Sequence, residues 1–175
     1  MNPSELFRSG SKITPILPRL SGDARRTGFL NPSIYRWRGE YCAILRSVNY
    51  VIYHSESKQQ GHPWGHLLYL HPENDAHLRT NNYFCRFNPD LSLHTIQPID
   101  TSEFDTYTPK WQFVGLEDAR LFEWDDRLYM CGVRRDTNPD GQGRMEMSEI
   151  SVTNQAVKEV SRWSIPLPES VDSHP

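Results

Sequence analysis

Short runs of apolar and aromatic residues, each about as long as a β-strand, alternate with polar turn segments along most of the 175-residue chain. The turns contain Gly, Pro, Asn or Asp, which supply the positive φ angles and Asx turns of antiparallel hairpins. This pattern predicts an all-β meander. The expected strands cover residues 33–37, 41–53, 67–70, 82–87, 91–96, 113–124, 127–133, 144–151 and 157–165.

Residues 1–28 have a different character, since proline and glycine recur there with little apolar periodicity. We expect this segment to be an extended N-terminal arm. The ordered domain, residues 29–175, is expected to begin at Phe29.

Two stretches of the remaining sequence, about residues 29–98 and 113–166, follow the same plan. Each begins with a strand that carries polar residues at its head, followed by a turn, a second strand and two further strands. Four antiparallel strands per repeat are typical of a β-propeller blade. Two blades do not close a ring, so we expect an incomplete propeller whose open sheet edges a second copy of the chain would cover. The alternative is a compact β-sandwich that is complete in itself.

The chain carries 19 Lys and Arg residues against 22 Asp and Glu residues, which gives a formal charge of -3. This balance provides no electrostatic field for nucleic acid, which we therefore do not expect as a partner. No stretch approaches the roughly 20 apolar residues of a membrane span, and the amino terminus lacks an apolar signal core. We expect a cytoplasmic protein without membrane contact, whose three cysteines are reduced core residues.

The segment Glu117-Asp118-Ala119-Arg120 is the strongest candidate for chemistry. Side-chain alternation along a strand places Asp118 and Arg120 on one face and turns Glu117 to the other. An aspartate beside a guanidinium stays ionised when the site is free, whereas a sugar packed over it would raise its pKa, as a general acid requires. The alternative is a structural Asp–Arg pair that pins a hairpin.

A second group of polar residues lies in the first stretch. Asn31 and Ser33 stand at the head of a strand, and Arg46 and Asn49 follow. Amide, hydroxyl and guanidinium groups of this kind hydrogen-bond the vicinal hydroxyls of a sugar. The alternative is that Asn-Pro-Ser forms an ordinary turn.

Two patterns resemble metal sites but depart from them. A run with calcium-loop spacing has methionine where the bidentate glutamate belongs, and a histidine-rich loop is interrupted by proline and glycine. We expect a hairpin turn and an exposed loop there and no metal, with Trp64 in the loop as an alternative stacking surface for a sugar. The residues of the two patterns are Asp136, Asn138, Asp140 and Met147, and His62, His66 and His71.

The two polar segments together resemble a known family. FLNPSIYRWRGEYCAILRSVNY and FVGLEDARLFEWDDRLYMCGVRRD are similar to the inner-strand motifs of glycoside hydrolase family 130, the mannoside phosphorylases and related mannosidases, which are five-bladed β-propellers. More distant members of the same propeller superfamily, of the arabinanase and invertase type, also resemble them. The resemblance covers about residues 29–136 in two islands, and Ala119 stands where family members usually have proline.

The resemblance implies an active site lined by the first strands of successive blades. Asp118 would be the catalytic acid that protonates the leaving oxygen of a β-mannoside-like glycan, and inorganic phosphate or water would attack the anomeric carbon with inversion. No cofactor is implied beyond phosphate as a co-substrate. The residues expected to bind the sugar are Asn31, Ser33, Arg46, Asn49, Glu117 and Arg120, and those expected to clamp phosphate are Arg134 and Arg135.

Two alternatives stay open at this point. Arg134 and Arg135 could form a solvated face instead of a phosphate clamp. The whole chain could be a carbohydrate-binding propeller module, or a fragment of a longer propeller, that keeps the pocket and performs no chemistry.

Overall fold

The structure is a computed structural model that describes residues 3–12, 15–16, 18, 28–54, 67–70 and 74–166. Strands dominate this part of the chain, so the prediction of an all-β fold is confirmed. The one helix among the described residues is α1 (Pro3–Arg8). It lies in the segment that we expected to be an extended N-terminal arm. Glu5 in its first turn and Arg8 in its last turn complement the helix dipole.

Two four-stranded antiparallel meanders form the body of the protein, and we call them the first unit and the second unit. Their strands are paired in the order β1-β2-β5-β6 and β11-β10-β9-β8. The first unit consists of β1 (Gly28–Trp37), β2 (Glu40–Val48), β5 (Leu78–Phe87) and β6 (Leu93–Asp100). The second unit consists of β8 (Glu117–Trp124), β9 (Arg127–Arg134), β10 (Arg144–Val152) and β11 (Val157–Ser164).

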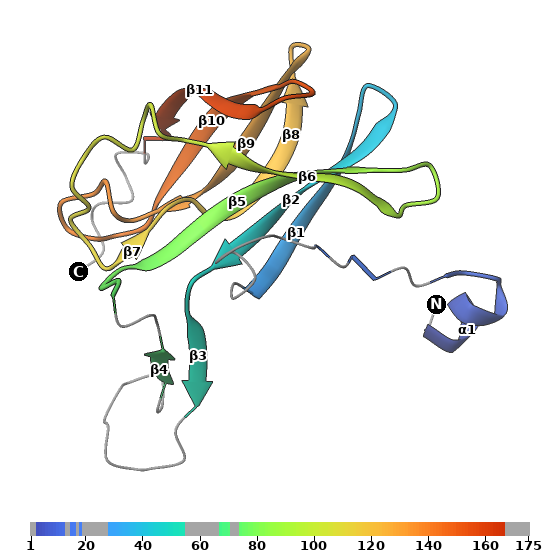
Figure 1. Ribbon diagram of the computed structural model, residues 1–175, viewed down its shortest axis with the longest axis horizontal. Helices are drawn as coiled ribbons and strands as arrows, with labels where there is room; N and C mark the ends of the chain where they lie inside the picture. Colours follow the sequence, from blue (N-terminus) through green and yellow to red (C-terminus); the bar gives the residue numbers. More distant parts are fainter. Residues whose placement is uncertain are drawn as a thin grey trace.

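The two units are joined at both ends, which makes the sheet nearly closed and barrel-like (Figure 1). At one end β6 pairs in parallel with β11, where Ile99 lies opposite Val157. At the other end β1 lies against β8, and the backbone N–H of Leu121 donates to Oγ of Ser33 at 2.9 Å. The polar heads of the two units therefore meet where β1 approaches β8.

The main hydrophobic core fills the space between the units. Strand β2 is buried on both faces, because Cys42 and Ile44 point into this core while Ala43, Leu45 and Cys85 of β5 form a second cluster on the outer face of the first unit. This explains why β2 reads as a continuous apolar run in the sequence. The buried residues of the main core are Cys42, Ile44, Phe84, Ile99, Leu116, Ala119, Leu121, Leu128, Met130, Ile150 and Val157.

Two of the expected strands are each divided in the structure. The run at residues 41–53 splits into β2 and β3 (Val51–His54), and β3 pairs with β4 (Leu67–Leu70) in a hairpin that projects away from the body (Figure 1). The run at residues 113–124 splits into β7 (Phe113–Val114), which pairs in parallel with β5, and β8. Gly115 separates them with a φ of 101°.

No helix within the described ranges has the length and apolar character needed to cross a membrane. The histidine-rich loop and Trp64 lie outside the described residues. All three cysteines are free thiols; Cys42 and Cys85 are buried and Cys131 is half-buried.

Candidate functional site

Asn31 and Asp118 occupy equivalent bulged positions at the heads of the two units. The pairing of β1 with β2 shifts register between Leu30 and Ser33, and the pairing of β8 with β9 shifts between Glu117 and Arg120. Within these bulges Asn31 has a φ of 49° and Asp118 a φ of 52°, a conformation that Asn and Asp tolerate better than other non-glycine residues. A bulge re-aims its side chain, and here both side chains turn toward the junction of the units.

The bulges bring together side chains that are far apart in the sequence. Nδ2 of Asn31 donates to Oδ1 of Asp118 at 2.5 Å, and Nη1 of Arg46 donates to the same oxygen at 2.8 Å. The Asp118 side chain remains 48% exposed, so the carboxylate is held from the protein side and open to a ligand from the other. We call Asn31, Arg46, Glu117 and Asp118 the Asp118 cluster.

Arg46 is the buried anchor of this cluster. The residue is only 6% exposed, and its Nε and Nη2 donate to Oγ1 of Thr80 at 3.3 and 3.2 Å. Nη2 also donates to the hydroxyl of Tyr50 at 3.1 Å. A guanidinium fixed by this many partners presents its remaining edge to Asp118 in one orientation.

Glu117 lies on the same side as Asp118, which corrects the expectation that strand alternation would separate them. Its Oε2 is 3.3 Å from Nη2 of Arg46, and its Oε1 is 3.9 Å from Nε of Arg135. The bulge at Asp118 interrupts the alternation, because a residue with positive φ no longer follows the pleat. Two adjacent carboxyl groups therefore share one guanidinium.

The two carboxyl groups have opposite pKa shifts. Burial is the largest influence on each and acts to raise the pKa. For Asp118 the hydrogen bond from Asn31 and the charge of Arg46 together outweigh burial and hold the pKa below its usual value. For Glu117 burial outweighs the charges of Arg46 and Arg135 and raises the pKa. Environments that push the pKa values of two neighbouring carboxyl groups apart are typical of sites where one group accepts a proton and the other donates one.

Three of the other residues expected to bind a sugar have structural partners. Oγ of Ser33 accepts the Leu121 N–H that joins β1 to β8. The Asn49 amide accepts from the N–H of Arg79 at 2.7 Å and donates to the carbonyl of His77 at 3.1 Å, so it fixes the start of β5. Arg120 is exposed, and its Nη1 lies 3.5 Å from the carbonyl of Pro32 in the neighbouring bulge.

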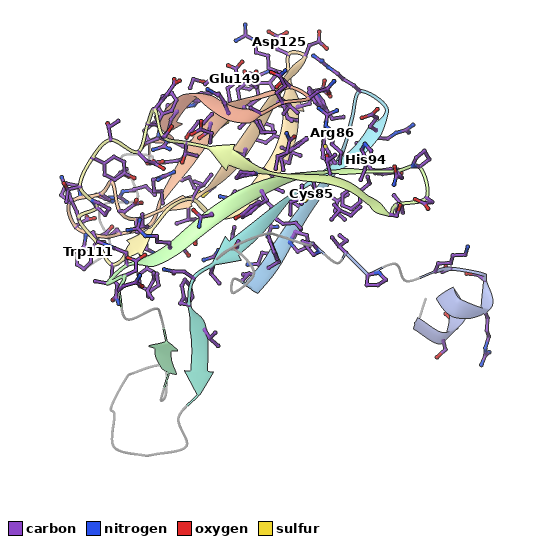
Figure 2. The ribbon with its side chains drawn as sticks, viewed as in Figure 1. Cys85, Arg86, His94, Trp111, Asp125 and Glu149 are labelled. Atoms are coloured by element: carbon purple, nitrogen blue, oxygen red, sulfur yellow. The ribbon has the colours of Figure 1, made fainter. Side chains whose placement is uncertain are left out.

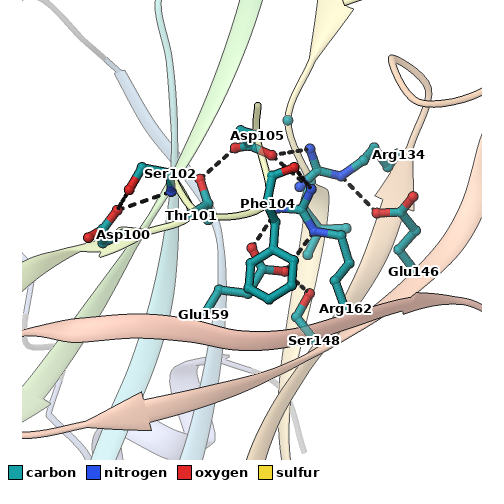
Figure 3. Close-up of polar contacts among 12 residues, drawn as sticks. Asp100, Thr101, Ser102, Phe104, Asp105, Arg134, Glu146, Ser148, Glu159 and Arg162 are labelled. Atoms are coloured by element: carbon teal, nitrogen blue, oxygen red, sulfur yellow. Dashed lines mark hydrogen bonds and ion pairs between the residues drawn. The ribbon is translucent and has the colours of Figure 1, made fainter. Parts of the chain in front are cut away.

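Arg134 does not reach the Asp118 cluster, which corrects the expectation that it would pair with Arg135 as a phosphate clamp. Its side chain is 2% exposed and faces the space between the units (Figure 3). Nε lies 2.8 Å from Glu146, and Nη1 donates to Tyr107 at 2.9 Å and to Asp105 at 3.3 Å. Its acidic partners already neutralise this guanidinium, so it is not a free cation for phosphate. Arg135, whose side chain is 43% exposed, remains beside Glu117.

Thr80 is a neighbour of the cluster that the sequence did not single out. It binds Arg46 from β5, at a separation of 34 residues. No local motif marks such a contact, because it depends on the pairing of β2 with β5. Asp136, which imitates the first position of a calcium loop, is fully buried and accepts a hydrogen bond from Tyr107 at 2.7 Å.

A groove of about 970 Å³ lies away from the Asp118 cluster, between the tips of the β1–β2 and β5–β6 hairpins. Arg86 and His94, labelled in Figure 2, line it together with Tyr41. No member of the Asp118 cluster contributes to it. In the part of the chain that the structure describes, no group of three or more His, Cys, Asp or Glu side chains is arranged to hold a metal ion.

Comparison of the chain with protein-family models, with curated proteins and with solved structures finds no match. The functional assignment therefore depends on the geometry of the Asp118 cluster and on the chemistry that its groups can perform.

Proposed function

We propose that the Asp118 cluster binds a β-mannoside-like glycan and that Asp118 protonates the leaving oxygen in an inverting phosphorolysis or hydrolysis. One observation carries this proposal. Asn31 from the head of the first unit and Asp118 from the head of the second meet at a single carboxylate oxygen, beside the buried guanidinium of Arg46. A half-exposed carboxylate flanked by fixed donors suits the hydroxyl-rich edge of a sugar.

Binding would itself create the acid. In the free site Asn31 and Arg46 favour the ionised form of Asp118. A sugar ring packed over the carboxylate would remove water from it and raise its pKa, so that it takes up a proton from solvent. Asp118 then gives this proton to the glycosidic oxygen as the bond from that oxygen to the anomeric carbon breaks. A phosphate oxygen forms the new bond to the anomeric carbon from the opposite face, or a water molecule forms it and releases its proton to solvent.

Two further residues have roles in this proposal. Glu117, whose pKa is raised by burial, supplies a hydrogen bond to the sugar beside Asp118. Arg135 is the guanidinium that remains available to an incoming phosphate dianion, since Arg134 is enclosed by its own partners. A phosphorylase needs no second carboxylate base, because phosphate is already an anionic nucleophile.

The same proposal takes the two units as blades of a glycosidase-like five-bladed propeller. Support comes from the four-stranded meander of each unit and from Asn31 and Asp118, which stand 87 residues apart at equivalent bulges. In a propeller the leading strands of successive blades line a common mouth, which is where such residues would act.

Saccharide recognition without turnover is the second candidate function. The lowered pKa of Asp118 favours it, because an ionised carboxylate accepts hydrogen bonds from hydroxyl groups and has no proton to give. The ion pair of Arg134 with Glu146 inside the protein also favours recognition without turnover, because only Arg135 of the expected pair then remains for phosphate.

Replacement of Asp118 separates the two functions. With β-1,4-mannobiose in phosphate buffer, D118N should release neither sugar phosphate nor free sugar, while its affinity stays within about tenfold of wild type, or about 1.4 kcal/mol. Asp125, exposed in the β8–β9 turn, provides the control, and D125N should turn over normally. Wild-type protein that binds the disaccharide without turnover would support recognition instead. Absence of binding by the wild type would contradict both functions.

A further inference from the structure

A second cavity, of about 210 Å³, lies between the units on the inner side of β5. It is separate from the Asp118 cluster, none of whose residues lines it. The two sites touch through Thr80, which lines the cavity and accepts hydrogen bonds from Arg46. Part of the lining is polar and part is apolar, and we call these parts the polar wall and the apolar wall. The polar wall includes Thr80, Asn82, Asp105, Tyr107 and Arg134, and the apolar wall includes Ile99, Pro109, Val114, Leu116 and Met130.

The polar wall contains an unused hydrogen-bond acceptor. Asn82 is 9% exposed, and its Nδ2 donates to the carbonyl of Leu116 at 2.9 Å. Its Oδ1 has no hydrogen-bond partner within the described part of the chain. A buried amide oxygen without a partner is costly, so the site favours a ligand with a hydroxyl or N–H group to donate. The hydroxyl of Thr80 accepts from Arg46 and still has its own hydrogen to donate.

The charges around the cavity oppose an anionic ligand. Behind the polar wall, four acidic side chains surround Arg134 and Arg162. Three of them, Asp105, Glu146 and Glu159, are labelled in Figure 3. Nε of Arg134 lies 2.8 Å from Glu146, and Arg162 makes paired contacts with Glu159. Acidic groups outnumber basic ones in this network. Arg79, the other arginine that lines the cavity, is paired with Asp75 at 2.6 Å. A phosphate or a carboxylate in the cavity would therefore meet net repulsion. The four acidic residues are Asp105, Asp136, Glu146 and Glu159.

The size of the cavity limits the ligand to a single small ring. About 210 Å³ is far more than the roughly 15 Å³ that one water molecule needs, and less than the roughly 300 Å³ at which pockets for drug-sized ligands begin. A pyranose has an apolar face of C–H groups and an edge of hydroxyl groups, which matches the two walls.

We propose that this cavity binds one neutral monosaccharide, at a second carbohydrate site behind Arg46. The inference goes beyond the proposed function, because it requires no turnover at Asp118. The acceptor Oδ1 of Asn82 and the donor hydroxyl of Thr80 hold the hydroxyl edge, and Leu116 and Met130 pack against the C–H face.

Amide NMR of the full-length protein tests the proposal with D-mannose as the probe. Mannose should shift the signals of Gly115 and Leu116, which line the cavity, and N82L should weaken this binding about tenfold, the value of one lost hydrogen bond. The matched control is N154L, because Asn154 is exposed in the β10–β11 turn, and it should bind mannose like the wild type. D118N should also leave these shifts unchanged.

A second measurement avoids any effect of substitution on folding. In the wild type, mannose should shift the Gly115 and Leu116 signals while inorganic phosphate and mannuronate leave them in place. Shifts produced equally by phosphate would overturn the inference. Full retention of the mannose shifts in N82L would also overturn it, and would leave the Asp118 cluster as the place of sugar binding in agreement with the proposed function.

Discussion

At the scale of single residues, the site depends on one carboxylate oxygen that accepts from both Asn31 and Arg46. These donors keep Asp118 ionised and correctly oriented while half of its side chain faces solvent. Glu117 is more buried and has a raised pKa, so its charge costs stability in the free protein. A group that costs stability at a polar site is typical of function rather than of folding.

The variant E117Q should therefore be more thermally stable than the wild type near pH 7. The folded-state pKa of Glu117 lies above its unfolded value, so its contribution to stability is fully present at low pH and is lost as pH rises through the folded pKa. The difference in melting temperature should be largest near pH 7 and shrink toward about pH 4. Melting curves across this range check the prediction. A difference that grows on acidification would show that the pKa of Glu117 is lowered instead.

At the scale of elements, two β-bulges and one glycine create the site from otherwise regular hairpins. The bulges turn Asn31 and Asp118 toward each other, and Gly115 ends β7 and starts the segment that leads into β8. At Gly115 a Cβ atom would lie 2.2 Å from the carbonyl oxygen of Thr80. Only glycine at this position therefore allows the backbone to approach β5 so closely.

The variant G115A should lower the free energy of unfolding by about 2 kcal/mol or more, because it combines a positive-φ penalty with a backbone clash. Gly39 supplies the control, since it has a φ of 84° and open space around its Cβ position. G39A should cost only about 1 kcal/mol, the penalty of the left-handed conformation. Urea titration of both variants measures the difference. If both variants lost the same free energy of unfolding, the backbone at Gly115 would not lie as close to Thr80 as the structure shows.

Much of the element-level structure could be predicted from the sequence. The apolar runs at residues 127–133 and 144–151 match β9 and β10 closely, because periodicity reports strands that have one face in the core. The position of Glu117 could not be predicted, since a bulge breaks alternation without a distinctive composition. The burial of Arg134 was also missed, because it depends on Glu146 and Asp105, which only the assembled fold brings to it.

At the scale of the whole molecule, two units face each other and enclose charged groups as well as apolar ones. Arg134, Glu146 and Glu159 are all almost fully buried on the inner face of the second unit. The loop between β6 and β7 supplies Asp105, which binds both Arg134 and Arg162 and so ties this loop to the second unit. Breaking a buried ion network by removing one partner is far more costly than breaking a surface pair.

The variant R134M should therefore destabilise the protein by about 3 kcal/mol or more, because it leaves buried carboxylates without their counter-charge. Arg127 offers a matched control, since its side chain is 62% exposed and its contact with Glu149 lies on the surface. R127M should change stability by less than about 1 kcal/mol. Chemical denaturation of the two variants checks this prediction. Similar small effects would indicate that water reaches the network.

Titration of the Asp118 carboxyl carbon by NMR, with and without β-1,4-mannobiose, tests the central claim most directly. In the free protein the pKa should lie below the usual value of 3.8, as the contacts with Asn31 and Arg46 require. With the disaccharide bound it should rise, because the sugar excludes water from the carboxylate. A pKa that the disaccharide leaves unchanged would contradict the proposal that Asp118 acts on a glycan.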